Sequence, residues 1–310
     1  MNKRALPRNP GKKRGLDLRN NWQKHLMMMP VLVILGIFCY VPMVGIVMAF
    51  QDYIPSQGYF GSPWVGLDWF KYMFSMQNFK QVVWNTLFLS LLKLSTGLLC
   101  SVIFALMLNE MRIKWLRSLI QSFALFPFFV SWVVLADIVK DMASSEGIIN
   151  QAVCALTGST IPFLTDSKWF TVLLVISNIW KEIGYNAIII MAALTAIDPA
   201  LYEAATLDGA GRFQKMHYIT LPGIRNIVMV LLILALGSVM SAGFDQVYNL
   251  YNTTVRDGAD IIDTYVYRMG INGGLYSLGT AVGLFKSVVG AILLILSYKA
   301  ADKWAGYRIF

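Results

Sequence analysis

The sequence is poor in charged residues and in histidine. Charged residues account for 14% of the 310 positions, whereas hydrophobic residues account for 57%, and a soluble chain of this length carries more charge on its surface. The two histidines, His25 and His217, lie far apart and outside any cluster of ligands or nucleophiles. The three cysteines show no metal-ligand spacing. These absences argue against a metal centre or a nucleophilic enzyme and indicate a membrane protein.

Two sequence patterns are also missing. No Gly-x-x-x-x-Gly-Lys-Ser/Thr motif occurs, since Gly11-Lys12-Lys13 lacks the required context, so the chain is not expected to bind nucleotide phosphates itself. There is no internal repeat of the kind that secondary transporters build from a single chain. The formal net charge of +9 does not indicate nucleic acid, because the basic residues collect beside apolar runs rather than in a stripe with interleaved aromatics.

Long apolar runs are what the sequence has in quantity. Six runs, at residues 26–50, 82–108, 117–139, 169–196, 223–243 and 278–300, are long enough to cross ~30 Å of hydrocarbon. The first run is too long for a signal-peptide core and lacks a small-x-small cleavage site, so it is expected to remain as a spanning helix. The sequence therefore predicts an all-α, polytopic membrane protein with six transmembrane helices.

The distribution of Lys and Arg predicts the orientation of these helices. One side of the membrane receives the basic residues of the N-terminal segment, followed by Arg112, Lys114, Arg117, Arg212, Lys215, Arg225, Lys299, Lys303 and Arg308. The segments on the other side mix basic residues with many aspartates. Under the positive-inside rule, both termini and the loop at 198–222 are cytoplasmic. The predicted organisation is a basic tail at 1–25, a transmembrane domain at 26–300 and a tail at 301–310.

The loop at 198–222 is polar and separates two apolar runs, so it is expected to leave the membrane and return. Asp198-Pro199 supplies the N-cap acceptor and the proline that begin a helix. Asp208-Gly209 favours a break, because glycine takes the positive φ that ends one helix while aspartate can cap the next. The prediction is a helix-turn-helix at the membrane surface.

The same loop carries a family signature. It has the spacing Glu-Ala-Ala, three residues, Gly, nine residues, Ile, one residue, Leu-Pro, filled by Glu203, Ala204, Ala205, Gly209, Ile219, Leu221 and Pro222. This spacing resembles the loop that marks permease subunits of binding-protein-dependent ABC importers. The resemblance implies the type I importer permease fold and a location in the bacterial cytoplasmic membrane.

In that family the loop is a coupling helix that sits in a groove on a cytoplasmic ATPase. The resemblance assigns this contact to Glu203, Ala204, Ala205, Asp208 and Gly209. It also implies that the chain is not catalytic and binds no cofactor, with ATP and magnesium held by two copies of the ATPase subunit. A second, homologous permease subunit would complete the pore.

The outer segments resemble one branch of the family. Segments 58–70, 243–250 and 263–268, together with Trp132, are similar to maltose-type carbohydrate permeases that work with a lipoprotein-anchored receptor on complex oligosaccharides. The resemblance covers nearly the whole chain. It implies an extracytoplasmic solute-binding protein as a partner and an oligosaccharide as the substrate, without identifying the sugar.

Charged residues within the predicted spans are functional candidates, because each is costly in hydrocarbon unless it faces a partner or water. Lys93, Lys181 and Lys286 meet this criterion, and Glu182 is the one carboxylate well inside a predicted span. Either Glu182 neutralises one or two of the lysines and joins the second, fourth and sixth helices, or these residues contact the substrate. The first account is favoured, and the sequence does not assign the pairs.

Two polar faces are candidates for the walls of a pore. Asn178, Lys181, Glu182 and Tyr185 follow helical spacing on the fourth helix, with Asn186 beside them, and Ser238, Ser241, Phe244 and Asp245 do so on the fifth. Amides and hydroxyls that reach sugar hydroxyls, and rings that stack on sugars, suit a carbohydrate passage. Ordinary polar packing between helices is the alternative for each residue.

Two other functions remain open from the residues alone. The intramembrane charges would serve an ion-coupled secondary transporter as a proton relay, and a polar intramembrane face would serve an enzyme that acts on a lipid-linked sugar. The filled loop signature favours the ABC permease over both, because neither rival needs an ATPase contact.

Overall fold

The structure of the chain, a computed structural model, describes residues 22–305, with side chains described for 22–299. Most of the predicted basic tail at 1–25 and half of the tail at 301–310 therefore lie outside the described residues. The chain divides into two compact units, Met1–Val47 and Met48–Phe310. Among the described residues every regular element is a helix.

In the first unit, α1 (Trp22–Leu35) continues through η1 (Gly36–Tyr40) into η2 (Val41–Phe50), whose last residues belong to the second unit. Together they form an apolar helix with a mean hydropathy of 2.6 over its most apolar window. This helix contains the first predicted span and begins four residues before it.

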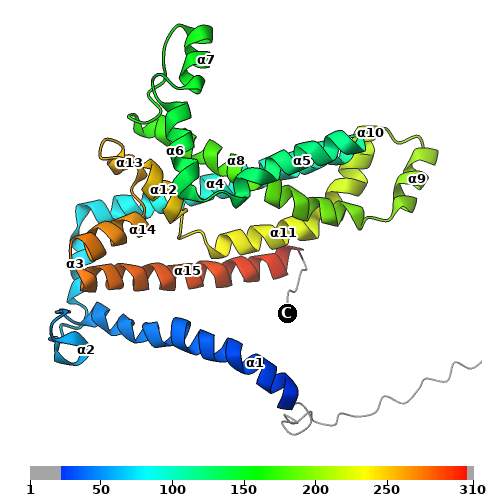
Figure 1. Cartoon of the computed structure of the whole chain (residues 1–310). Helices are drawn as coiled ribbons and strands as arrows, with labels where there is room; N and C mark the ends of the chain where they lie inside the picture. The colour runs from blue at the N-terminus through cyan, green and yellow to red at the C-terminus, as the bar shows by residue number, and fades with distance from the viewer. Residues whose placement is uncertain (1–21, 306–310) are drawn as a thin grey trace, which may run out of the picture. The chain divides into compact units, whose positions relative to one another are not determined.

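The second unit contains four long apolar helices: α4 (Gln77–Glu110), α8 (Ser167–Thr195), α11 (Leu221–Gly237) and α15 (Tyr276–Ala305). Each contains or matches most of one predicted span. Figure 1 shows α5 (Lys114–Phe129) alongside α8, and α11 alongside α15. Shorter helices lie in the connections: α2 (Gly58–Gly61), α3 (Asp68–Ser75), α9 (Pro199–Leu207), α10 (Arg212–Lys215), η3 (Met216–Thr220), α12 (Phe244–Leu250), α13 (Arg256–Ala259), α14 (Ile262–Tyr265) and η4 (Val266–Asn272).

The predicted span at 117–139 is a broken helix. α5 (Lys114–Phe129) ends at an extended Val130, and α6 (Trp132–Ala143) begins after Ser131, whose side chain accepts a hydrogen bond from the Val134 amide. α5 and the segment from α6 to α7 (Ile148–Thr157) are bent by 109°. The described chain thus has five helices long and apolar enough to span a membrane, or six spans when this bent pair is counted as one.

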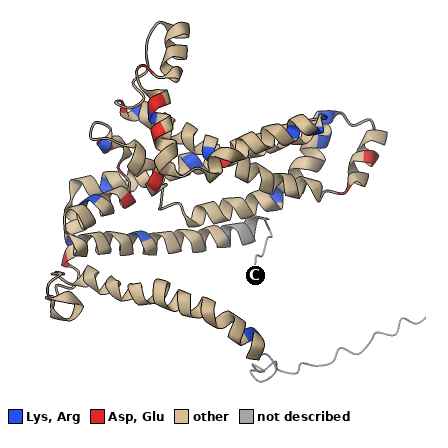
Figure 2. Cartoon of the chain, in the orientation of Figure 1, with Lys and Arg blue, Asp and Glu red and all other residues tan. Residues whose placement is uncertain are grey.

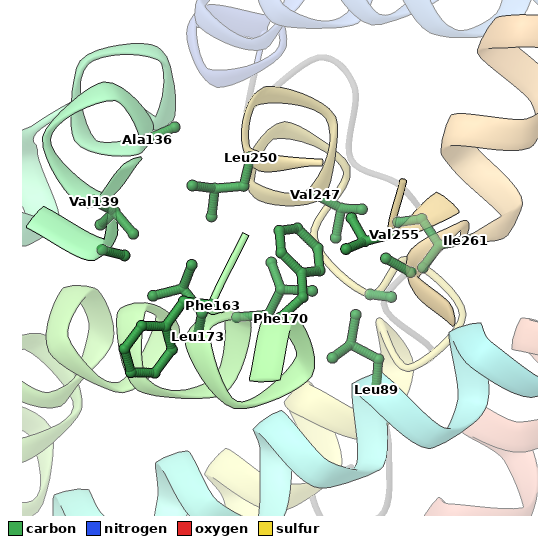
Figure 3. Close-up of a cluster of buried hydrophobic side chains, with 14 residues drawn as sticks. Leu89, Ala136, Val139, Phe163, Phe170, Leu173, Val247, Leu250, Val255 and Ile261 are labelled. Atoms are coloured by element: carbon green, nitrogen blue, oxygen red, sulfur yellow. The ribbon is translucent and has the colours of Figure 1, made fainter. Parts of the chain in front are cut away.

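The core of the second unit is built from three apolar clusters. One joins α12 to α4, α6 and α8 around Leu89, Phe170 and Val247 (Figure 3). A second lies where α3, α14 and α15 meet the start of α4. A third packs the C-terminal halves of α4 and α8 against the start of α11. Figure 2 shows that most of the length of α11 and α15 is uncharged, as spanning helices require.

Residues 251–275 are anchored by a polar network. Asp260, only 5% exposed, accepts two hydrogen bonds from the Arg268 guanidinium, at 3.1 and 2.5 Å, and one from Thr264. The hydrogen bond to Asp260 raises the pKa of Arg268 above its ordinary value. The Gln81 and Asn85 amides of α4 donate to the Asp257 carbonyl at 2.6 and 3.0 Å. These contacts hold the short helices α13 and α14 against α4.

Candidate functional site

A polar cavity of about 490 Å³ lies within the second unit. Its walls come from α4, α8 and α11 and from the segment that follows α11. The polar residues that line it are Ser90, Lys93, Asn178, Glu182, Asn186, Ser238 and Ser241. The other lining residues are apolar or glycine, among them Leu94, Leu98, Leu231 and Leu234. Hydroxyls, amides and one charge of each sign therefore share the wall of the cavity with apolar side chains.

The α8 wall of the cavity consists of Asn178, Glu182 and Asn186. Their spacing of four residues places them one above another on the same face of the helix. All three side chains are partly exposed in the chain. The sequence predicted this wall, although it included two neighbours that face elsewhere.

Lys181 and Tyr185, both predicted to face the substrate pathway, do not line the cavity. Lys181 donates to the carbonyls of Pro127 at 3.2 Å, Phe128 at 3.1 Å and Val130, at the end of α5 where helix carbonyls run short of backbone donors. The Tyr185 ring stacks on Phe128, with the ring centroids 4.3 Å apart and the planes at 3°. Both residues therefore fasten α8 to α5.

Close backbone approach reinforces that contact. A Cβ atom added to Gly184 would lie 2.2 Å from the Ala124 carbonyl oxygen, so a residue with a side chain does not fit there without moving α5. The predicted polar face of α8 is therefore two faces, one toward the cavity and one toward α5.

Glu182 forms no direct ion pair in the described part of the chain. Its charge acts on Lys93 and Lys181 from a longer range, so their neutralisation by Glu182 stays a prediction, while each lysine has other partners in direct contact. Lys286 pairs with Asp263 at the start of α14, and Lys181 caps α5. Lys93, buried beside the cavity, donates to the Ala242 carbonyl at 2.8 Å and to Gln246.

The predicted polar face of the fifth helix is not helical. α11 ends at Gly237, and the chain turns through residues 238–243, where Ala242 has a φ of 45° and Gly243 a φ of 83°. Ser238 and Ser241 line the cavity from this turn. Neither Phe244 nor Asp245, at the start of α12, is among the lining residues, so the predicted common face does not exist.

Phe244 belongs instead to an aromatic group at the side of α12. Its ring stacks on Tyr248 at 5.3 Å, and the Tyr267 ring meets Tyr248 at 4.9 Å. Tyr248 is 38% exposed. Asp245 is exposed on the same helix. Figure 1 shows α12, which carries Phe244, Asp245 and Tyr248, far from α9.

Sequence reasoning missed two residues of the cavity region. Ser90 lies three residues before Lys93 on α4, lines the cavity and is only 7% exposed. Gln246 on α12 is 1% exposed and contacts Lys93. A hydroxyl one turn from an intramembrane lysine was a usable signal for Ser90. No local signal marks Gln246, because its partners come from other helices.

The loop at 198–222 forms the predicted helix-turn-helix. The Asp198 carboxylate accepts a hydrogen bond from the Ala200 amide at 2.9 Å, and Pro199 occupies the first turn of α9. Gly209 ends the helix with a φ of 79°, and the Ala210 amide donates to the Ala205 carbonyl at 2.8 Å. These are the features expected of a capped helix followed by a left-handed residue.

One detail of the predicted loop is wrong. Asp208 does not cap the second helix, because it is the last residue associated with α9. α10 begins after Gly211, whose amide donates to the Gln214 side chain at 2.7 Å. Gln214, rather than an aspartate, therefore satisfies a free amide at that helix start.

Side-chain contacts hold the loop in one shape. The Tyr202 hydroxyl lies 3.0 Å from the Thr220 hydroxyl, and Lys215 donates to Thr206 at 2.7 Å. Arg212 forms an ion pair with Glu110, the last residue of α4. The loop is thus joined to α4 by a charge pair and to α8 by a link of only three residues.

The loop presents an exposed mixed surface. Glu203 and Ala204 are exposed on α9, and Leu207 and Phe213 are 90% and 83% exposed. Large apolar side chains at such exposure, beside a carboxylate, are typical of a protein contact site. Figure 1 shows α9 at the outer edge of the unit, clear of the long helices.

The fold and site together define a class of protein: a multi-pass helical membrane transporter subunit with a polar cavity and an exposed helix-turn-helix loop, at 198–222, at one end. Residues 97–306 match the model of the family described as binding-protein-dependent transport system inner membrane component. The chain belongs to this family. It is the membrane-spanning permease subunit of an ABC import system, as the loop signature predicted.

The chain is similar to two proteins of Bacillus subtilis (strain 168) along most of its length. It is 46% identical to Protein LplB, covering 94% of this chain and 92% of that protein. It is 42% identical to the polygalacturonan/rhamnogalacturonan transport system permease protein YteP, covering 92% of this chain and 89% of that protein.

A solved structure also matches. It is the bacterial alginate ABC transporter in complex with an alginate pentasaccharide-bound periplasmic protein. One of its chains is 35% identical to this chain with a TM-score of 0.85, and the match covers 94% of this chain and 98% of that chain. The predicted permease fold is therefore confirmed.

Proposed function

We propose that this chain forms one half of a translocation pore for an oligosaccharide and couples that pore to cytoplasmic ATPases. The observation that carries the proposal is the cavity between α4, α8 and α11, whose amides and hydroxyls match the hydrogen-bonding groups of a sugar. The relatives named for polygalacturonan, rhamnogalacturonan and alginate transport support a carbohydrate ligand.

The proposed assembly contains a second, homologous permease subunit, two copies of an ATPase subunit and an extracytoplasmic lipoprotein that binds the solute. The ATPases hold ATP and magnesium and supply the energy, while this chain binds neither. The alginate transporter, solved with its periplasmic protein, supports the solute-binding partner. The exposed surface of α9, with Glu203 beside apolar groups, supports the ATPase contact.

The contacts of the loop suggest how motion would pass through this chain. When the ATPases draw together, α9 and α10 move with them. Arg212 transmits that displacement to Glu110 at the end of α4, and the short link at 196–198 transmits it to α8. Because α4 and α8 provide two walls of the cavity, their displacement changes which end of the cavity is open.

In the proposed orientation, the α9 loop and both termini lie on the cytoplasmic side of the bacterial cell membrane. Single cysteines in a chain without its three native cysteines test this. Exposed positions Ser159 and Thr253 should be modified by an impermeant thiol reagent added outside, whereas exposed positions Lys114 and Gln214 should not. Modification of Gln214 from outside would refute the orientation and the ATPase contact with it.

The function itself is tested by uptake in vesicles that contain the purified complex. The reference complex should import an oligosaccharide from a panel only when ATP and the solute-binding protein are present. Asn178→Leu should lower that uptake up to about tenfold at subsaturating substrate, because a lost hydrogen bond is worth ~0.5–1.5 kcal/mol. Asn78→Leu, at an exposed position on the first turn of α4, is the matched control.

The outcomes of this assay are distinct. Uptake by the chain alone under a proton gradient would identify an ion-coupled transporter and refute the proposal. Equal uptake by the Asn178→Leu and reference complexes would remove this residue from the pathway without touching the role of the chain as a permease.

A further inference from the structure

Gln246 is a deeply buried polar side chain that contacts Lys93 of the cavity wall. It is 1% exposed, lies on the first turn of α12 and is not itself a lining residue. Its amide nitrogen donates to the Leu174 carbonyl at 2.7 Å and to the Ser177 hydroxyl at 2.8 Å, both on α8. Its amide oxygen accepts from Lys93 on α4.

These contacts use both N–H groups of Gln246 and at least one lone pair of its oxygen. Lys93 in turn donates to the Ala242 carbonyl at 2.8 Å. We call Lys93, Gln246, Ser177 and the two carbonyls of Leu174 and Ala242 the Gln246 network. It joins α4, α8 and α12 where the residues of the turn at 238–243 line the cavity.

The turn that carries α12 is the least regular part of this region. Ala242 has a φ of 45°, a left-handed conformation that is unfavourable for a residue with a Cβ. Gly243 follows with a φ of 83°. Residues held in such conformations persist only where their surroundings fix them. The hydrogen bond from Lys93 to the Ala242 carbonyl is one such constraint.

Lys93 also connects the network to the contents of the cavity. Its side chain lines the cavity, as does Ser90, whose buried hydroxyl has no hydrogen-bond partner among the described residues. An ammonium carries three donors, and the two contacts above use two of them. A ligand oxygen beside Ser90 can therefore accept a hydrogen bond from the third donor, which connects a bound ligand directly to the Gln246 network.

We propose that Gln246 is a positioning residue that holds α12 against α4 and α8 and so fixes the turn at 238–243, which lines the cavity. The proposal rests on the proposed function only for its orientation, in which α12 lies at the outer end. Release of the Gln246 network lets α12 move away from α8, which displaces this wall of the cavity and admits solvent from the extracytoplasmic side.

The reporter for this movement is Val247→Cys in a chain without native cysteines. Val247 is 0% exposed and packs in the cluster between α12, α4 and α8 (Figure 3). Its modification by an impermeant thiol reagent added outside therefore requires α12 to separate. The experiment uses the full complex in membranes, without ligand, and measures the modification rate together with ATP hydrolysis.

Gln246→Leu should raise the modification rate at least tenfold, because leucine fills the site without joining the three helices. Lys93→Met should raise it as well, since it removes the contacts with Gln246 and Ala242. Asn249→Leu is the matched control, because the Asn249 amide donates only to the Asp245 carbonyl of its own helix, at 2.7 Å. That control should leave the rate unchanged.

Ser177→Ala removes a single acceptor of Gln246 and provides a second, milder variant, with an expected rise of about two- to threefold. If the Gln246→Leu complex does not assemble, the rate of Val247→Cys modification in the Ser177→Ala complex tests the proposal. Rates equal to the reference in the assembled variants, or an equal rise with Asn249→Leu, would overturn the proposal. Oligosaccharide uptake by the reference complex is measured separately, so failure of the network leaves the transport function standing.

Discussion

Gly209→Val is expected to abolish the ATP hydrolysis that the solute-binding protein and substrate stimulate in the assembled transporter, while leaving the permease folded in the membrane. Gly209 has a φ of 79°, and a Cβ atom added there would meet nothing within 4 Å. The penalty is therefore conformational rather than steric: ~1–2 kcal/mol for a left-handed residue with a Cβ, and more for a β-branched one. With valine at this position, the backbone would move to a negative φ to relieve the strain. That change would alter the turn and displace α9 relative to α10.

Two control substitutions distinguish an effect of the altered turn on coupling from a general folding or assembly defect of the permease. Gly209→Asn should keep most stimulated hydrolysis, because asparagine tolerates a left-handed conformation better than other non-glycine residues. Gly158→Val matches the backbone geometry, with a φ of 75° and open space around the added atom, but it lies at the end of α7. Hydrolysis should be measured in vesicles at equal amounts of complex. Full stimulation with Gly209→Val would show that this turn does not serve coupling.

Lys181→Met is expected to lower sharply the amount of assembled complex. The substitution leaves the carbonyls of Phe128 and Val130 without the Lys181 donor, while the Pro127 carbonyl keeps the hydrogen bond from the Val130 amide. An acceptor left without a partner costs ~1–3 kcal/mol, so a loss of about 2 kcal/mol or more is expected from these two carbonyls. The contact with the Trp132 ring, whose centroid lies 5.4 Å from the Lys181 amine, is lost as well. α5 would then part from α8 at the break before α6.

The neighbouring substitution Glu182→Gln should behave in the opposite way. Glu182 lines the cavity and has no ion pair among the described residues, so the amide should leave assembly near the reference level and lower uptake only. Lys168→Met, at an exposed lysine on the same helix, controls for loss of charge. The two readouts are the yield of purified complex and the uptake per complex. A normal yield with Lys181→Met, or a collapsed yield with Glu182→Gln, would contradict the roles assigned by the geometry.

The shape of the α9 loop was predictable because its determinants are local. An N-cap acceptor, a proline in the first turn and a glycine at the helix end act within a few residues of one another. Asp208 failed as the predicted cap because the second helix begins further along the chain, after Gly211. The side chain that reaches a free amide depends on where the turn ends, and in the structure it is Gln214.

The contacts of the polar faces were less predictable than the loop. Helical spacing shows which residues lie on the same side of a helix, but it does not show which other helix or cavity that side meets. Asn178 and Tyr185 share a broad side of α8, yet α5 packs against one part of it and the cavity meets the other. On the fifth span, periodicity was extended past Gly237, where the helix ends. Apolar residues continue beyond that point, so hydropathy alone carried no signal for the turn.

The sequence by itself determined that this protein is a multi-pass helical permease with a coupling-type loop. Spanning helices follow from apolar length, and the loop from local caps and spacing, so neither depends on which helices meet. Only the tertiary structure decided the partners of Lys93, Lys181 and Lys286, which are Gln246, the end of α5 and Asp263. A buried amine takes whichever acceptor the packing of distant segments brings within ~3 Å, and sequence spacing does not encode that proximity.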